Sequence, residues 1–193
     1  MEHSPHMEKV FVSAEELLKD SFELALQIFE SGYRPSFIVG VWRGGTPVGI
    51  AVQEVLEMLG CPTNHFAIRT SSYGGDMKQA KDVKVFGLQH MVDTINADDR
   101  LLIIDDIFDS GRSIDAIIKA LGEKCRLNTP TDIKVATVYY KPTRNQTART
   151  PDFYLHETDA WTVFPHELQG CDVEELRKNK NLPERFFKLL DQT

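Results

Sequence analysis

The stretch that decides the fold runs Leu101-Leu102-Ile103-Ile104-Asp105-Asp106-Ile107-Phe108-Asp109-Ser110-Gly111-Arg112-Ser113. Four consecutive branched aliphatic residues bounded by charge predict a strand covered on both faces, as in parallel α/β sheets. Asp105 and Asp106 follow at the carboxyl end of this strand. The next apolar residues recur at helical spacing, at Ile114, Ile117, Ile118 and Leu121. Residues 110–113 are therefore the predicted loop between a strand and a helix.

The rest of the chain supports an α/β fold. Ser13 and Glu16 have the spacing of a capping box, and the helix that follows is predicted to end at Gly32. Further strands are predicted at 36–42, 64–68 and 133–140, and a second helix at the Thr46 cap and Pro47. The polar segment 69–84 is predicted to be a long functional loop. Short strands at 153–155 and 161–164, then an interrupted helical region at 173–190, are interpreted as a subdomain.

The loop at 110–113 has the composition of an anion site. Backbone N–H groups at a helix N-terminus, with the positive end of the helix dipole behind them, favour a bound anion. Ser110 and Ser113 add hydroxyls, Gly111 allows close approach, and the adjacent carboxylates Asp105 and Asp106 suit the two hydroxyls of a ribose. Ligands of open α/β sheets bind at the carboxyl ends of the strands. These residues together predict a site for a sugar phosphate.

This segment resembles the phosphoribosyl pyrophosphate (PRPP) signature of the type I phosphoribosyltransferases, and every position fits. The resemblance implies a PRPP site formed by Asp105, Asp106, Asp109, Ser110, Gly111, Arg112 and Ser113. It also implies a central, mostly parallel sheet flanked by helices, with a small hood subdomain. Nucleotide triphosphatases share the strand that ends in two acids, but they need a Walker A loop. The nearest candidate, residues 40–46, has glycine where the phosphate-binding lysine should be.

Two other segments match the family in order. Arg43-Gly44-Gly45 after a strand is compatible with a tight turn, or with a second anion loop. The resemblance makes it the pyrophosphate loop, in a form similar to the bacterial xanthine-guanine enzymes. Ser72-Tyr73 is compatible with plain loop polarity, yet the hypoxanthine-guanine branch carries a Ser-Tyr pair in the flexible loop that closes over the site.

The remaining candidates concern the base. A lysine at a strand end is most often solvated, but in 6-oxopurine enzymes the lysine matching Lys141 donates to O6 of the purine. The segment from Trp161 and Thr162 resembles the part that stacks on the purine and reads its edge, and Glu167 matches an acid that helps to bind magnesium. His166 departs from the aromatic residue common there, which leaves the base preference open. Asp109 is compatible with a helix cap, whereas the resemblance places it near purine N7 as a proton acceptor or donor. Arg112, at the variable position of the signature, is compatible with a solvated residue.

Composition limits the other possibilities. The formal net charge is -7 and basic residues are scattered, which argues against nucleic acid as the main partner. No apolar stretch reaches the roughly 18 residues of a membrane span and the N-terminus has no signal-peptide core, so a cytoplasmic protein is expected. Cys61, Cys125 and Cys171 are widely spaced and predicted to be reduced. The 193 residues are expected to form one phosphoribosyltransferase domain, its core at about 10–145 and its hood mainly at 146–193.

The resemblance implies a purine salvage enzyme that transfers the phosphoribosyl group from PRPP to N9 of hypoxanthine, guanine or xanthine. Mg²⁺, held by substrate oxygens with Glu167 and with Asp105 or Asp106, would be the cofactor. Its partners would be small molecules, neither nucleic acid nor membrane, and the family commonly forms homodimers or homotetramers. Two alternatives stay open: an enzyme for another base, and a PRPP-binding regulator that binds RNA.

Overall fold

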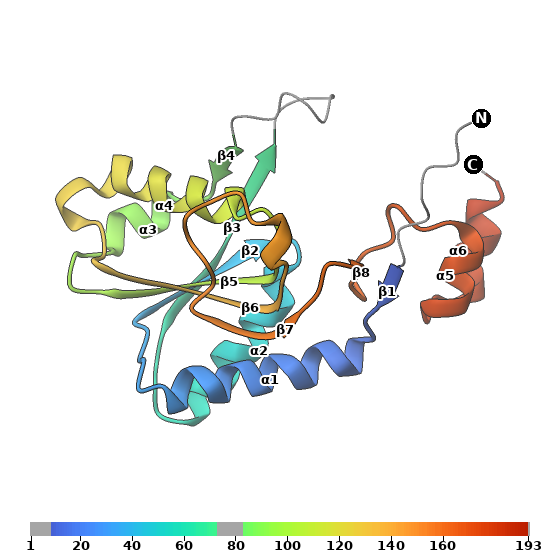
Figure 1. Cartoon of the computed structure of the whole chain (residues 1–193), viewed down its shortest axis with the longest axis horizontal. Coiled ribbons are helices and arrows are strands. Elements are labelled where there is room, and N and C mark those ends of the chain that lie inside the picture. The colour runs from blue at the N-terminus through green and yellow to red at the C-terminus, as the bar shows by residue number, and fades with distance from the viewer. Residues whose placement is uncertain (1–8, 73–82, 193) are drawn as a thin grey trace. The chain divides into compact units, whose positions relative to one another are not determined.

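The structure is a computed structural model of the chain, and it describes residues 9–72 and 83–192 (Figure 1). The chain divides into two compact units. Leu18–Asp159 forms the larger unit, and the residues up to Leu17 form the smaller unit together with those from Ala160 onward.

The larger unit is built on a six-stranded sheet with the order β4-β3-β2-β5-β6-β7. Its strands are β2 (Phe37–Trp42), β3 (Asn64–Ser72), β4 (Val83–Phe86), β5 (Arg100–Phe108), β6 (Asp132–Tyr140) and β7 (Phe153–Glu157). All neighbouring strands are parallel except β3 and β4, which are antiparallel. Because β2, β5 and β6 are adjacent and parallel, their carboxyl ends lie at one edge of the sheet.

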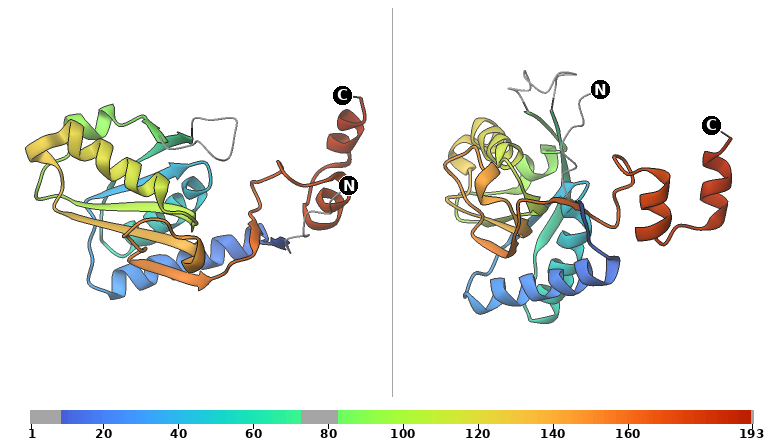
Figure 2. Two further views of the ribbon diagram at one scale, coloured as in Figure 1. Left: turned by 45° about the horizontal axis from the view of Figure 1, so that its top comes forward. Right: turned by 45° about the vertical axis from the view of Figure 1, so that its right-hand side comes forward.

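Helices cover both faces of this sheet. α1 (Ala14–Glu30) and α2 (Gly45–Met58) lie on one side, and α3 (Gln89–Thr94) and α4 (Arg112–Cys125) lie on the other (Figures 1 and 2). Residues Leu101 to Ile104 of β5 are completely buried, as expected for a strand covered on both faces. The core under α3 and α4 joins Val39 of β2 and Val135 of β6 to Ile117 of α4. The predicted α/β fold with a central, mostly parallel sheet is confirmed.

The first helix begins as the sequence predicts. The Ser13 hydroxyl oxygen accepts a hydrogen bond from the Glu16 N–H (3.1 Å), and the Glu16 carboxylate accepts one from the Ser13 N–H (2.9 Å). These two bonds satisfy donors that an uncapped helix start leaves free. The pKa of Glu16 is lowered, because the hydrogen bonds from Ser13 favour its charged form.

Three boundaries differ from those expected. The second helix begins at Gly45, with Gly44 as its N-cap and no side-chain cap, so Thr46 lies inside the first turn and does not cap it. The segment 69–84 is not a loop throughout, because β3 continues to Ser72 and pairs with β4. The strand at 153–157 adds to the main sheet beside β6, although its short apolar run suggests a strand of the subdomain. Each difference depends on pairing or packing between segments that local sequence patterns do not reveal.

The smaller unit has a two-stranded parallel sheet of β1 (Lys9–Phe11) and β8 (Trp161–Val163). Two short helices follow, α5 (Val173–Asn179) and α6 (Glu184–Leu190). Asp172 and Glu175 form a capping box at the start of α5. Lys9 ties the first strand to this helix, because its ammonium lies 2.7 Å from Oε2 of Glu175.

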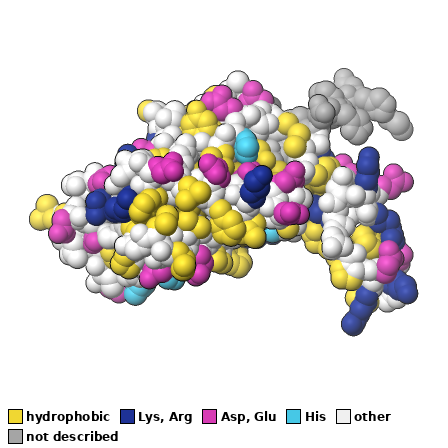
Figure 3. Space-filling view, turned by 90° about the horizontal axis from the view of Figure 1, so that it is seen from below, with side chains coloured by type: hydrophobic (Ala, Val, Ile, Leu, Met, Phe, Trp, Pro, Cys, Tyr) yellow, Lys and Arg dark blue, Asp and Glu magenta, His cyan; other side chains and the backbone are white. Residues whose placement is uncertain are grey.

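Hydrophobic side chains also lie at the surface. Figure 3 shows them gathered along the middle of one face, and α1 of the larger unit exposes Leu18, Phe22 and Leu26. Within the part of the chain that the structure describes, no helix has both the length and the apolar character needed to cross a membrane.

Candidate functional site

The loop between β5 and α4 forms a small hollow. Gly111 is the N-cap of α4 in the left-handed conformation (φ 77°), and no side chain caps the helix. The first N–H groups of a helix without a side-chain cap are available to a ligand, and the helix dipole favours an anion there. A cavity of about 80 Å³ lies at this point, and Asp105, Asp109, Ser110 and Ser113 contribute to its lining. Its volume exceeds the roughly 10–15 Å³ that a single water molecule needs.

The two acidic residues lie against the glycine loop. A Cβ atom on Gly44 would overlap the Asp106 carboxylate, and one on Gly45 would lie 2.8 Å from the Cα atom of Asp105. Only glycine therefore allows this contact between the loop and β5. Burial raises the pKa of the Asp105 carboxyl well above its usual range, and the neighbouring Asp106 carboxylate raises it further. The crowding disfavours two full negative charges at the strand end, so the two carboxyl groups suit hydroxyl groups, or a cation that would favour their charged forms.

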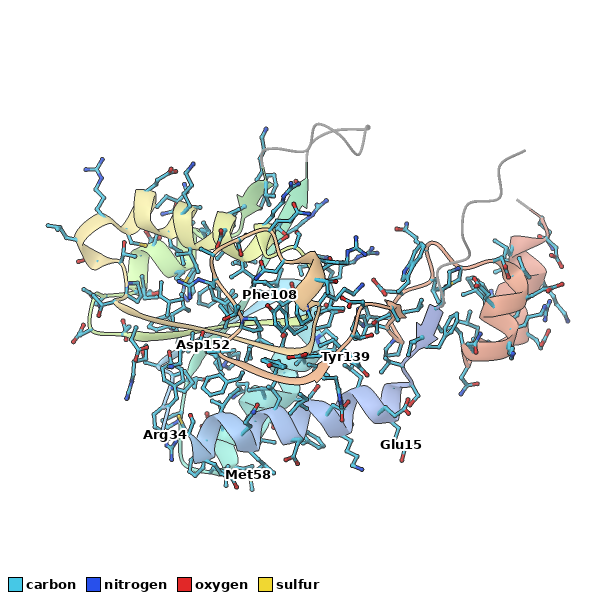
Figure 4. All side chains as sticks on the ribbon, in the orientation of Figure 1. Glu15, Arg34, Met58, Phe108, Tyr139 and Asp152 are labelled. Carbon is cyan, nitrogen blue, oxygen red and sulfur yellow. The ribbon has the colours of Figure 1, made fainter. Side chains whose placement is uncertain are left out.

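Asp109 and Lys141 lie at the ends of adjacent strands. The Lys141 ammonium is 3.5 Å from Oδ2 of Asp109, and only 5% of the lysine side chain is exposed. β5 and β6 pair in register up to Phe108 and Tyr140, so the next residue of each strand falls at the same edge. Phe108, labelled in Figure 4, packs edge-on against the Tyr140 ring with centroids 5.6 Å apart. Lys141 is therefore a buried, paired lysine, and Asp109 does not cap the helix.

The base candidates of the smaller unit lie on β8 and the turn after it. Trp161 keeps 43% of its surface exposed, with the Lys9 ammonium 5.2 Å from its ring centroid. The buried Thr162 hydroxyl has no hydrogen-bond partner among the described residues. Glu167 turns back on its own segment, where its carboxylate accepts a hydrogen bond from the Phe164 N–H (3.0 Å).

The larger unit thus brings most of the predicted residues together. Gly44 and Gly45 contact the Asp105–Asp106 pair, and Asp109 pairs with Lys141. Trp161, Thr162 and Glu167 belong to the smaller unit and are grouped on one short stretch. Ser72 is the last residue of β3, while Tyr73 lies outside the described residues. Arg43 is exposed and precedes the glycines after a cis peptide bond with Trp42.

The acidic residues fit a magnesium ion that a substrate brings with it. Among residues 9–72 and 83–192, no group of three or more His, Cys, Asp or Glu side chains is arranged to hold a metal by itself. Mg²⁺ is usually held by one or two carboxylates together with waters and substrate phosphates, and not by an all-protein cage. The adjacent carboxylates of Asp105 and Asp106 match that donor set.

One residue of this site, Arg144, was not predicted from the sequence. Nε of Arg144 lies 3.0 Å from Oδ1 of Asp109, so this carboxylate is paired on both oxygens. Arg144 ends a short 3₁₀ turn, Pro142–Arg144, directly after Lys141. The only local signal was an arginine three residues after the candidate lysine.

Residues 12–170 match the phosphoribosyl transferase domain family. The chain belongs to this family. A search of curated protein sequences gives no match. The membership that the Leu101–Ser113 stretch predicts is confirmed, and the chain is accordingly a phosphoribosyltransferase.

Solved structures of purine phosphoribosyltransferases share this fold. The purine phosphoribosyltransferase from Pyrococcus horikoshii is 26% identical over 86% of this chain and 99% of its own, with a TM-score of 0.68. The xanthine-guanine-hypoxanthine phosphoribosyltransferase from Helicobacter pylori is 24% identical, with 89% and 99% coverage and a TM-score of 0.66. A hypoxanthine phosphoribosyltransferase from Staphylococcus aureus is 18% identical, with 90% and 88% coverage and a TM-score of 0.62. These last two likenesses concern the fold alone.

Proposed function

We propose that this phosphoribosyltransferase acts on a 6-oxopurine and transfers the 5-phosphoribosyl group from PRPP to N9 of hypoxanthine, guanine or xanthine. The products would be a nucleoside 5'-monophosphate and pyrophosphate. The observation that carries the proposal is the Asp109–Lys141 pair, which lies beside the sugar-phosphate loop at the carboxyl edge of the sheet. Lysine has only donors to offer, so Lys141 suits an oxygen acceptor such as O6 of the base and disfavours the amino group of adenine.

The two loops of the larger unit would hold PRPP. The cavity at the start of α4 suits the 5'-phosphate, since backbone N–H groups and the Ser110 and Ser113 hydroxyls can donate to it. The carboxylates of Asp105 and Asp106 would accept hydrogen bonds from the ribose hydroxyls and favour the positive charge that develops on the ribose. Arg43 and the glycine loop would hold the pyrophosphate.

Two residues have proposed roles at the base that come from the family resemblance. Asp109 of the larger unit would accept the proton of purine N7 while the glycosidic bond forms. On the smaller unit, the exposed ring of Trp161 is the proposed stacking surface for a purine. When bound, Mg²⁺ would act as a Lewis acid on the pyrophosphate oxygens, with Asp105, Asp106 or Glu167 as its protein ligands. No covalent intermediate with the enzyme is needed for this transfer.

Release of pyrophosphate from PRPP and Mg²⁺ tests the proposal, with hypoxanthine, guanine, xanthine and adenine supplied separately. We expect turnover with one or more of the oxo purines and none with adenine. Asp109→Ala should reduce kcat by about 10²–10⁴-fold, the usual effect of losing a positioned proton acceptor. Asp98→Asn, a change at an exposed aspartate of the 95–99 turn, is the matched control and should retain full activity.

Two outcomes would contradict the proposal. Turnover with adenine or a pyrimidine alone would assign another base. If PRPP binds but no base is converted, the chain is a PRPP-binding regulator, and retention of RNA on a filter would then distinguish the RNA-binding kind.

A further inference from the structure

The Asp109 carboxylate has a separate cation on each oxygen. Lys141 lies 3.5 Å from Oδ2, and Arg144 lies 3.0 Å from Oδ1. The two cations differ in their surroundings, since the Lys141 side chain is 5% exposed and that of Arg144 is 49% exposed. A half-exposed ion pair adds little to stability, so the Arg144 contact has no strong structural purpose.

Backbone hydrogen bonds hold the turn that carries both cations, without help from the Arg144 side chain. The Lys141 N–H donates to the Phe108 carbonyl (2.9 Å), and the Arg144 N–H donates to the Lys141 carbonyl (3.2 Å). On the far side of Asp109, the Gln146 N–H donates to the Ser110 carbonyl (3.0 Å). The turn is thus attached to the chain on both sides of Asp109. Shortening the Arg144 side chain should leave it folded.

The proposed function makes two demands on Lys141 at once, and this inference rests on that function. Lys141 pairs with Asp109 in the structure, yet it is also the group expected to donate to O6 of the base. When Lys141 turns to the base, Asp109 loses one of its two cations just as the bound base excludes water. An unpaired carboxylate in a desolvated site is costly and poorly fixed.

We propose that Arg144 is a positioning residue that keeps Asp109 in place as a charged acceptor while Lys141 turns from Asp109 to the oxo group of the base. Its planar guanidinium stays charged at any working pH and approaches the oxygen that Lys141 does not use. Arg144 does not itself contact the reacting atoms. It acts through Asp109 and frees Lys141 for the base.

Steady-state kinetics of Arg144→Gln, with the oxo purine and PRPP varied separately, provide the main test. We expect kcat/KM for the base to fall about tenfold, as for the loss of one charge-assisted hydrogen bond, with KM for PRPP within about twofold of wild type. Arg144→Lys should recover most of the activity because it restores the charge. Arg100→Gln is the matched control: this exposed arginine begins β5, at the end opposite Asp105, and its loss should change neither constant.

A double variant separates positioning from a merely local effect. If Arg144 acts through Asp109, adding Arg144→Gln to Asp109→Asn should cost almost nothing further. The proposal is overturned if the full tenfold loss appears in the Asp109→Asn background. It is also overturned if Arg144→Gln has wild-type kinetics, or if it weakens PRPP as much as the base.

A measurement without turnover keeps this inference distinct from the proposed function. In protein labelled with ¹³C at the aspartate carboxyl carbons, the Asp109 signal should stay near its wild-type position in Lys141→Met and move in Arg144→Gln. The reverse pattern would show that Lys141 alone fixes Asp109, and would overturn the role of Arg144. Absence of pyrophosphate release by the wild type with every base would instead contradict the proposed function.

Discussion

At Gly45, no side chain of any kind can be accommodated. A Cβ atom there would lie 2.8 Å from the Asp105 Cα atom and still closer to the Ile104 carbonyl oxygen, and these backbone atoms cannot rotate away. Gly45→Ala should therefore push the glycine loop from β5, destabilise the fold by about 1–3 kcal/mol as overpacking does, and weaken PRPP binding. Urea unfolding measures the first effect, and calorimetric titration with PRPP the second.

Gly122→Ala gives the matched comparison, because nothing lies within 4 Å of a Cβ atom at this exposed position of α4. Alanine there should stabilise the protein by about 0.5–1 kcal/mol, since glycine is the poorer helix former. If both variants unfold at the same urea concentration, the close contact between Gly45 and β5 is absent in solution.

The grouping of Asp105, Asp109, Ser110 and Ser113 around one cavity was predictable from the sequence, whereas the place of Arg144 was not. Asp105 to Ser113 form a continuous motif whose chemistry is local, so their grouping follows from spacing alone. The pairing of Arg144 with Asp109 depends on the register of β5 against β6 and on the turn after β6. No periodicity in the sequence specifies that register. A cation placed by a neighbouring strand therefore becomes visible only when the sheet is known.

Among the elements, the loop that follows β6 is held by the Asn145 side chain in addition to its backbone hydrogen bonds. The Asn145 amide donates to the Arg149 carbonyl (2.9 Å), and its carbonyl oxygen accepts from the Thr147 N–H (2.9 Å) and hydroxyl (3.0 Å). Asn145→Ala should cost about 1–2 kcal/mol of unfolding free energy, because a typical net hydrogen bond contributes about 1 kcal/mol. Amide exchange in peptides of the 142–150 segment should speed up as the loop opens.

The helix α4 provides the internal control for that exchange measurement, because its buried face does not rely on Asn145. Unchanged exchange over 142–150, together with faster exchange elsewhere in the protein, would show that other contacts hold the loop.

Buried elements such as β2, β5 and β6 were predictable because apolar runs and turn residues mark them. The pairing of β3 with β4 was missed because the paired part of β3, Arg69 to Ser72, is polar and β4 is a strand of only four residues at the sheet edge.

Over the whole molecule, the family and the central, mostly parallel sheet were predictable from the sequence, whereas the pairing of the shortest strands was not. β1 pairs with β8 across about 150 positions of sequence, from Lys9 to Trp161, so a three-residue strand near the N-terminus gains its partner only in the folded chain. The next strand back, β7, belongs to the larger unit instead. Such long-range pairings have no local signature, because short strands are specified by what they contact.

Alkaline pH should weaken the whole fold through Tyr33. Its hydroxyl donates to the Leu101 carbonyl (3.0 Å) of the central strand, and burial, followed by the Asp132 carboxylate, raises its pKa far above the usual value. An unfolded chain loses this proton near pH 10. Because the folded state binds the proton more tightly, its contribution to stability is complete below about pH 10 and is lost as the pH rises further.

Unfolding free energies from urea titrations at pH 7 to 11 measure this loss in wild type and in Tyr33→Phe. The variant should be about 1 kcal/mol less stable at pH 7, for want of the hydrogen bond, and its stability should fall less steeply above pH 10. Parallel curves for the two proteins would mean that Tyr33 ionises alike in both states. The loss of stability at alkaline pH would then come from other groups. The buried thiols of Cys61 and Cys125 would be the first to replace, because burial raises their pKa values as well.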